Sequence, residues 1–333
     1  MLEAAGYTDK AQRQHNEDAY FLNDDIGLFM VADGVGGLEA GEVASNLICD
    51  TINQRIIGGS GLEHAIAAAH VEVADSVSRG EGKQGMASTV VVARFTGDNY
   101  ELAWVGDSRI YLWDGQLKLL TKDHSYVQAL YDAGQITLEE TDTHPKKNVI
   151  TQAVGGSADT ISISSNRGTL GSGESLLLCS DGVSGEVTGE QLIEYMSASS
   201  APEEIARKLV AYALEAGGKD NATCVFVRSM AGESGDQGEA TARVIKPDVY
   251  RTYNQSESRY VSVPAGGAEA PEVSGSGAAQ LADSTSIIRA APKKEAIDAI
   301  VDVEHEPGKK PLLLIFCVAV AIATLAVFAL RVL

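Results

Sequence analysis

Acidic residues stand at the ends of several apolar runs in this chain. Asp33 follows "LFMVA" at 28–32 and Asp181 follows "LLLCS" at 176–180, and a glycine comes directly after each. The other acids placed beside apolar runs are Glu17, Asp18, Asp107 and Asp220. A single Asp-Gly pair is well explained by a tight turn, which favours both residues. Several acids in such positions also fit a shared binding site, and the pattern alone leaves both interpretations open.

The chemistry open to such acids is the binding of divalent cations. If the strands lie side by side, the carboxylates converge, and without a counter-charge they repel and raise one another's pKa values. Oxygen ligands without an obligate Cys or His favour Mg²⁺ or Mn²⁺ over Zn²⁺. Two such ions can hold a water and ionise it near neutral pH. The glycines would let the backbone approach, so the carbonyl group of Gly34 is itself a candidate ligand.

Arg13 is the candidate for binding an anionic substrate. It precedes Glu17 in the run "RQHNED", and a guanidinium can give a phosphoryl group two parallel hydrogen bonds. A surface arginine without such a role fits the same sequence, so both interpretations stay open.

Strands grouped between helices would have to position these residues. Apolar and β-branched runs predict strands at 26–32, 88–95, 100–106, 109–114, 175–180 and 222–228. Helical spacing predicts helices at about 40–57, 62–78, 124–133, 189–198 and 202–216. The middle strands are so close in sequence that hairpins must join them, which implies antiparallel pairing. We therefore expect an α+β fold, with sheets covered by helices and not a doubly wound βαβ order.

Composition and charge exclude some classes of function. The chain has 333 residues, 44% hydrophobic and 22% charged, which is typical of a globular protein. A net charge of −20 argues against electrostatic capture of nucleic acid, so no nucleic-acid partner is expected. The four cysteines are far apart, which disfavours a zinc site or a disulfide framework and fits a reducing compartment.

The C-terminal third differs from the rest of the chain. Small, polar sequence interrupted by Pro and Gly predicts a disordered linker over 230–310, after a folded domain at 1–229. The uncharged run at 312–330 is about 28 Å long as a helix, which predicts a transmembrane helix at 311–331. Lys309 and Lys310 before it favour a cytoplasmic flank. We expect a single-pass C-terminal anchor in the cytoplasmic membrane, with the catalytic domain in the cytoplasm and no signal peptide.

Six motifs together resemble one family. The runs "RQHNED", "VADGVGG", "MASTVV", "WVGDSRIYL", "LLLCSDGV" and "DNATCVFV" occur in the order and rough spacing of the PPM-type metal-dependent serine/threonine protein phosphatases, the protein phosphatase 2C family. The resemblance covers essentially residues 3–228. It implies an αββα sandwich of two antiparallel sheets flanked by helices, with a two-metal centre of Mn²⁺ or Mg²⁺ at one edge.

The resemblance also implies ligands for the first ion. Asp33 matches the bridging ligand, with the carbonyl group of Gly34 beside it. Asp181 and Asp220 match the acids that complete the surroundings of this ion.

Further roles follow from the same resemblance. Glu17 matches a contributor to the second ion's shell, and Asp18 a residue that orients metal-bound water. Asp107, with Asp181, matches the acids that hold a weaker third metal in bacterial relatives. Arg13 matches the phosphate-binding arginine.

One departure from the family pattern concerns the general acid. Val35 stands where many eukaryotic members have a histidine, which bacterial members often lack. His15 and His124 are nearby candidates, although a surface or supporting role fits each of them as well. The segment 132–150 resembles the mobile flap that the family has beside its site.

These observations predict a membrane-tethered, Mn²⁺- or Mg²⁺-dependent phosphatase of phosphoserine and phosphothreonine in proteins. The expected partners are phosphorylated proteins, among them a serine/threonine kinase and its substrates, and the membrane. One alternative is a catalytically weak or dead scaffold that binds phosphoproteins. Another is a dedicated regulator phosphatase of the anti-sigma-antagonist type.

Overall fold

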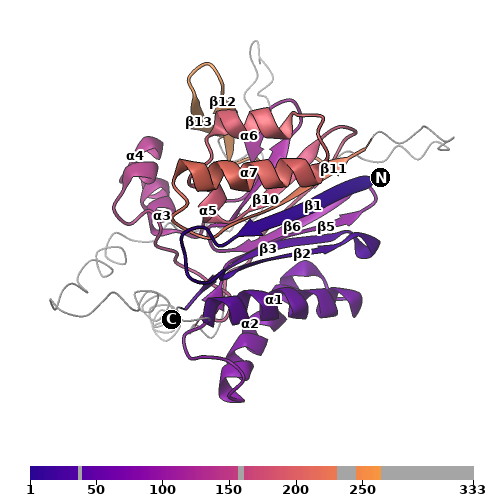
Figure 1. The fold of residues 1–333 in the computed structure, drawn as a ribbon, viewed down its shortest axis with the longest axis vertical. Coiled ribbons are helices and arrows are strands. Elements are labelled where there is room, and N and C mark those ends of the chain that lie inside the picture. The colour runs from indigo at the N-terminus through magenta and orange to yellow at the C-terminus, as the bar shows by residue number, and fades with distance from the viewer. Residues whose placement is uncertain (37–39, 157–160, 231–244, 264–333) are drawn as a thin grey trace, which may run out of the picture.

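Two β-sheets lie face to face with helices on both outer sides (Figure 1). The structure is a computed structural model, and it describes residues 1–36, 40–156, 161–230 and 245–263. The predicted transmembrane helix at 311–331 lies outside the described residues, and so does most of the predicted linker. In the ranges that the structure does describe, no helix is both long and apolar enough to cross a membrane.

The first sheet has seven strands, and neighbouring strands in it run antiparallel. In spatial order they are β1 (Leu2–Asp9), β11 (Ala222–Ser229), β10 (Ser175–Cys179), β7 (Arg109–Trp113), β8 (Leu117–Leu119), β12 (Arg251–Asn254) and β13 (Arg259–Ser262). The second sheet has six strands: β2 (Asp18–Asn23), β3 (Leu28–Val35), β5 (Val90–Thr96), β6 (Asn99–Val105) and β9 (Ser164–Thr169), with β4 (Ala87–Ser88) paired to β3.

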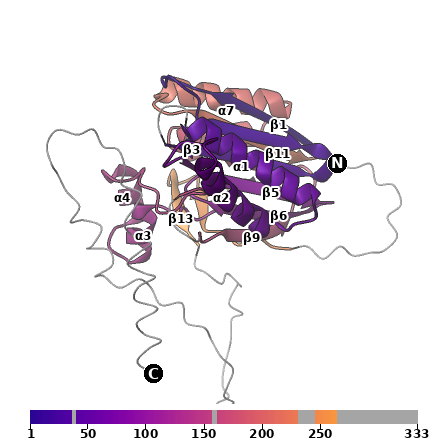
Figure 2. The same ribbon diagram turned by 90° about the horizontal axis from the view of Figure 1, so that it is seen from below.

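Helices cover the outer face of each sheet. The second sheet is covered by α1 (Ala40–Ile57) and α2 (Leu62–Ser78), as Figure 2 shows from below. The first is covered by α5 (Asp181–Ser184), α6 (Gly189–Met196) and α7 (Pro202–Ala216). A short 3-10 helix, Asp24–Ile26, links β2 to β3. Two further helices, α3 (Tyr126–Asp132) and α4 (Leu138–Thr143), lie together at one end of the sandwich (Figure 1).

Both faces of strand β3 are buried, which explains why its apolar run is continuous. Side chains alternate along a strand, so Met30 and Ala32 point toward α1 and α2, whereas Phe29 and Val31 enter the core between the sheets. All four are at most 1% exposed. Since both faces of this sheet are covered, alternation of apolar and polar residues is absent, and the run has no polar side. The expected αββα sandwich of two antiparallel sheets is confirmed.

The two Asp-Gly pairs do not form the tight turns that a simple interpretation would give them. Asp33 and Gly34 lie inside β3, which continues to Val35. Asp181 and Gly182 begin α5 directly after β10. Each pair therefore lies at or near a strand end for a reason other than reversing the chain.

The expectation of a disordered linker over 230–310 is wrong for residues 245–263. These residues include β12 and β13, which form an antiparallel hairpin, and β12 pairs with β8 at Arg251–Leu119 and Thr252–Lys118. The pairing covers an edge of the first sheet that β8 would otherwise leave open. The folded part of the chain therefore extends past residue 229.

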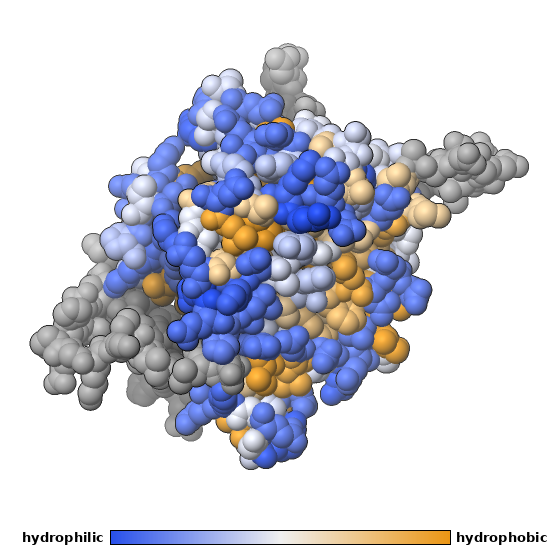
Figure 3. Space-filling view, viewed as in Figure 1, coloured by the Kyte–Doolittle hydropathy of each residue, from blue (hydrophilic) through white to orange (hydrophobic). Residues whose placement is uncertain are grey.

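The exposed surface of the sandwich is mainly hydrophilic. Figure 3 shows apolar residues scattered among polar ones on one face. The exposed large apolar side chains of the described residues are Met1, Tyr20, Val43, Ile57, Val71 and Met230. They are dispersed along the sequence, so a functional site is better sought among the polar groups.

Candidate metal centre

The pairing of β2 with β3 places two aspartates opposite each other. Asp18 is the first residue of β2, and its register partner in β3 is Asp33. Opposite residues of an antiparallel pair have Cβ atoms about 5 Å apart, so their carboxyl groups can meet.

Three more aspartates reach the same region from the other sheet. The central strand β10 pairs on both sides, and Cys179 near its end faces Arg109 of β7 and Cys224 of β11. Antiparallel pairing brings the residues after the end of β10 close to the residues before the starts of β7 and β11. The acids at those three positions are Asp181, Asp107 and Asp220. The strand order thus explains why acids far apart in sequence share one edge.

Electrostatics shows that these five aspartates form one cluster around Asp33. Burial raises the pKa of Asp33 well above its usual value, and the charges of Asp18, Asp181, Asp107 and Asp220 raise it further. Five of the residues expected at the site are therefore brought together, although neither sheet alone carries them all.

Asp18 is held by hydroxyl groups of the opposite sheet. Burial raises its pKa to about 7, while hydrogen bonds from Thr223 and Ser180 act in the opposite direction. The Ser180 hydroxyl donates to Asp18 Oδ2 at 2.8 Å, and Oδ1 is buried without a partner among the described residues. The carboxyl group thus has one fixed oxygen and one that is available.

Asp181 and Asp107 show the same signs of crowding. Burial raises the pKa of Asp181, and the charge of Asp220 adds to it, while a hydrogen bond with Asp33 lowers it. Its Oδ1 atom is also buried with no partner in the described part of the chain. For Asp107, burial and then the charge of Asp181 raise the pKa well above its usual value.

Glu17 and Gly34 lie against the beginning of α1. The Gly34 amide donates to the Glu17 carbonyl oxygen at 3.0 Å, and the Gly41 amide donates to Glu17 Oε1 at 3.3 Å. The N-terminal end of a helix favours a carboxylate, because its amide groups are unpaired. A Cβ atom on Gly34 would lie 2.2 Å from the Gly41 carbonyl oxygen. Only glycine therefore lets β3, the Glu17 loop and α1 approach so closely.

Gly182 has an equally strict steric role beside Asp181. A Cβ atom at this position would lie 1.9 Å from the Asn221 carbonyl oxygen, so the backbone of α5 contacts the segment after Asp220 directly. Both glycines thus allow close contact between backbone segments, whereas the role of the Gly34 carbonyl group as a ligand stays a prediction.

Asn221 is a structural residue of the site that the sequence reasoning missed. Its amide nitrogen donates to the carbonyl oxygens of Lys10 and His15 at 2.9 and 3.0 Å. Its Oδ1 atom accepts from the Glu17 amide at 2.8 Å. Asn221 thus joins the loop that carries Arg13 and Glu17 to the start of β11. The available signal was its position directly after Asp220 in "DNATCVFV".

Arg13 lies at the rim of the cluster and contacts Asp220. Its Nη2 atom is 2.6 Å from Asp220 Oδ2, and its Nε donates to the Lys219 carbonyl oxygen at 2.9 Å. The side chain is 52% exposed, so a ligand at the cluster can reach the guanidinium from solvent. In the described structure Nη1 has no hydrogen-bond acceptor, which leaves donors for such a ligand.

The two histidine candidates occupy different environments. His124 is enclosed: its Nδ1 accepts from the Gly106 amide at 3.2 Å, and its Nε2 lies 3.0 Å from the Ser164 hydroxyl. Burial lowers its pKa. Since both ring nitrogens are engaged, His124 supports the turn that carries Asp107. His15 is exposed, and its carbonyl oxygen binds Asn221.

The donor set fits a hard divalent cation. All the converging groups are oxygens, two of them are buried without partners, and nearby acids raise the pKa values of several carboxyl groups. A divalent cation would satisfy the oxygens and remove the repulsion. Across the described residues, no three Asp, Glu, His or Cys side chains already stand in a metal-binding arrangement.

The two-sheet sandwich, the acid-lined edge and the nearby arginine agree with the resemblance that the six sequence motifs indicate. The family model described as Protein phosphatase 2C matches residues 5–215. The chain belongs to this family.

Curated relatives and solved structures agree with this assignment. Serine/threonine protein phosphatase PstP of Mycobacterium tuberculosis is 36% identical over 235 residues, 68% of this chain and 44% of the relative. The match therefore spans less than half the length of that relative. Protein phosphatase PhpP of Streptococcus pneumoniae is 31% identical over 244 residues, 68% of this chain and 97% of the relative. A PstP catalytic domain solved with two manganese ions has a TM-score of 0.62 at 33% identity, covering 69% of this chain and 99% of that one.

Proposed function

We propose that this chain is a Mn²⁺- or Mg²⁺-dependent serine/threonine protein phosphatase. The observation that carries the proposal is the convergence of four aspartates from two sheets on a fifth, Asp33, where Asp18 and Asp181 each have a buried unpartnered oxygen. Membership of the Protein phosphatase 2C family and the two manganese ions of a similar catalytic domain support the choice of metal and reaction.

The proposed ligands are the acids that the two sheets bring together. They are Asp33 with the Gly34 carbonyl group, Asp181, Asp220, Glu17 and, for a weaker third ion, Asp107 with Asp181. When bound, such ions polarise phosphoryl oxygens and supply a water of lowered pKa as nucleophile.

The remaining residues bind and orient the substrate and the water. Arg13 donates hydrogen bonds to the phosphoryl group from the rim, since its guanidinium is half exposed and keeps Nη1 available. Asp18, held through Oδ2 by the Ser180 hydroxyl, uses its other oxygen to orient a water beside Asp33. The attack on phosphorus would need no covalent enzyme intermediate, because the nucleophile would be a water that the bound ions supply.

Hydrolysis of a phosphothreonine peptide by the full chain tests this proposal. We expect turnover with Mn²⁺, loss of turnover on chelation, and no turnover by Asp33→Ala or Asp181→Ala. Asp98→Ala is the matched control, since this aspartate lies in the turn between β5 and β6, away from the cluster. No metal-dependent turnover by the wild-type chain would contradict the proposal and favour a phosphoprotein-binding scaffold.

The cellular setting is part of the same proposal. The uncharged run at 312–330 and the preceding Lys309 and Lys310 support a single-pass anchor with the catalytic domain in the cytoplasm. A membrane-bound serine/threonine kinase and its substrates would then be the natural phosphoprotein partners. Recovery of the full chain in the soluble fraction of lysed cells would contradict the anchor.

A further inference from the structure

Residues 245–263, which follow β11 in the chain, contact both sheets of the sandwich. In the second sheet, the Asn166 amide nitrogen of β9 donates to the Asp248 carbonyl oxygen at 2.7 Å, and the Asp248 amide donates back to Asn166 Oδ1 at 3.0 Å. In the first sheet, the Tyr250 amide donates to the Leu119 carbonyl oxygen at 3.0 Å. The Tyr250 ring also packs edge-on against Trp104. We call residues 245–263 the tail segment.

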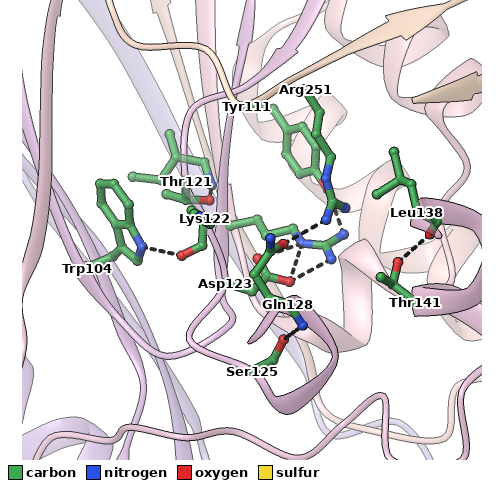
Figure 4. Close-up of polar contacts among 12 residues, drawn as sticks. Trp104, Tyr111, Thr121, Lys122, Asp123, Ser125, Gln128, Leu138, Thr141 and Arg251 are labelled. Atoms are coloured by element: carbon green, nitrogen blue, oxygen red, sulfur yellow. Dashed lines mark hydrogen bonds and ion pairs between the residues drawn. The ribbon is translucent and has the colours of Figure 1, made fainter. Parts of the chain in front are cut away.

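The tail segment contacts both helices at the end of the sandwich. Arg251 of β12 donates from Nη2 to Gln128 Oε1 of α3 at 2.8 Å, and both side chains are buried (Figure 4). The same Gln128 side chain donates to Asp132 Oδ1 at 2.9 Å, which holds its amide group in one orientation. One buried arginine of the tail segment thus fixes the middle of α3.

Two contacts at the surface extend this attachment to the whole helix pair. Arg259 of β13 forms an ion pair with Glu139 of α4, with 3.0 Å between Nη1 and Oε1. The Tyr131 hydroxyl group of α3 lies 2.5 Å from the Ser262 hydroxyl group. Arg251, Arg259 and Ser262 thus join the hairpin to residues 125–150. We call this range the flap segment, although only its residues 132–150 resemble the flap of the family.

The two residues directly before the flap segment contact the turn that carries Asp107 and the strand after it. The His124 amide donates to the Gly106 carbonyl oxygen at 2.8 Å. Asp123 forms a partly buried ion pair with Arg109, with 2.7 Å between Oδ2 and Nη2. These contacts place the start of the flap segment next to the turn that carries a residue of the proposed metal centre.

We propose that the tail segment, through Arg251, holds α3 and α4 in position beside the metal centre, so that Arg251 is a positioning residue for phosphoprotein substrates. The inference rests on the proposed function for its substrate. None of the proposed ligands lies in the flap segment, so the reacting phosphoryl group is held without it. A protein substrate extends beyond that group and contacts the surrounding surface, whereas a small phosphate ester does not.

The test compares Arg251→Met with Arg228→Met in the full chain. Methionine keeps the apolar stem of arginine and removes its hydrogen bonds. Arg228 is a matched control, because this partly buried arginine of β11 binds the carbonyl oxygens of Ala198 and Ser200. Arg228 also lies near the C-terminal end of β11, whereas Asp220 precedes the N-terminal end of this strand.

Amide hydrogen exchange gives a readout that is independent of catalysis. We expect amides of α3 and α4 to exchange about tenfold faster in Arg251→Met, the effect of losing one hydrogen bond to a charged donor. Amides of β10 and β11 should be unchanged. Equal exchange of α3 and α4 in Arg251→Met, Arg228→Met and the wild type would overturn the inference, whether or not the chain proves to be a phosphatase.

Kinetics gives the second readout. We expect the KM for a phosphothreonine peptide to rise several-fold in Arg251→Met, with kcat/KM for p-nitrophenyl phosphate unchanged and partial rescue by Arg251→Lys. An equal fall for both substrates would mean a general structural defect and would overturn the positioning role.

The exposed ion pair offers a test that does not endanger folding. Arg259→Glu should loosen α4 by the same exchange measurement, and the charge-swapped double variant Arg259→Glu/Glu139→Arg should restore it. Failure of the double variant to restore the exchange rates would count against the attachment.

Discussion

At the scale of single residues, the acids of the centre are costly to the protein without a cation. Burial is the main cause that raises the pKa values of Asp18, Asp33 and Asp107, and the charges of neighbouring aspartates add to it. A carboxyl group in this setting either keeps its proton or, when it ionises, lowers the free energy of unfolding. A divalent cation is the partner that reverses this balance, because it requires the carboxylates to be deprotonated.

The pH dependence of stability without metal should reveal this cost. For Asp18 the pKa rises from 3.8 to about 7 on folding, so its contribution is fully present below pH 3.8 and is lost as the pH rises through 7. A shift of this size corresponds to about 4 kcal/mol, and Asp33 and Asp107 act in the same direction. We expect the urea midpoint of the metal-free chain to be lower at pH 8 than at pH 5, with a smaller difference in Asp18→Asn.

The stabilisation of the chain by added Mn²⁺ should increase with pH, because metal binding must displace the protons of these carboxyl groups. The increase in the urea midpoint on adding Mn²⁺ should be larger at pH 8 than at pH 5. A metal-free chain that is equally stable or more stable at pH 8 would contradict the interpretation of the acid cluster.

At the scale of elements, close backbone contacts hold the acid-bearing segments in position. The α5 backbone at Gly182 contacts the Asn221 carbonyl oxygen, and the β3 backbone at Gly34 contacts the Gly41 carbonyl oxygen. Both contacts join segments from different parts of the sequence. The geometry of the centre therefore depends on small residues next to the acids as much as on the acids.

Gly182→Ala tests this dependence. The added Cβ atom would lie 1.9 Å from the Asn221 carbonyl oxygen, so α5 must shift away from the start of β11 and separate Asp181 from Asp220. We expect a loss of about 1–3 kcal/mol in the free energy of unfolding and a larger fall in metal-dependent activity. Gly61→Ala is the control, since open space surrounds that position. Wild-type activity in Gly182→Ala would show that the contact does not position the acids.

The sequence allowed the acids and six of the thirteen strands of the described residues to be predicted, because both leave local signals. Asp33 and Asp181 end or interrupt apolar runs, and such runs mark buried strands whatever the tertiary context. The only signal of the role of Asn221 was its position beside Asp220, since that role depends on hydrogen bonds to Lys10 and His15, which are distant in sequence. Tertiary hydrogen bonding of this kind has no period that a sequence pattern can show.

At the scale of the whole molecule, the folded unit is larger than the sequence predicted. The strands of the tail hairpin have four residues each and lie in polar sequence, so composition placed them in a linker. They fold because β8 offers an unpaired edge and because Arg251 and Tyr253 become buried there. The tail segment thus belongs to the same folded unit as the candidate metal centre.

Calorimetric titration of the full chain with Mn²⁺ tests the central claim most directly. We expect binding of two ions per wild-type chain, with a weaker third, and loss of the tight sites in Asp33→Asn, because all the other acids of the cluster surround that carboxyl group. Asp98→Asn should bind as the wild type does. No Mn²⁺ binding by the wild-type chain, or unchanged binding by Asp33→Asn, would contradict the assignment of this acid cluster as a metal centre.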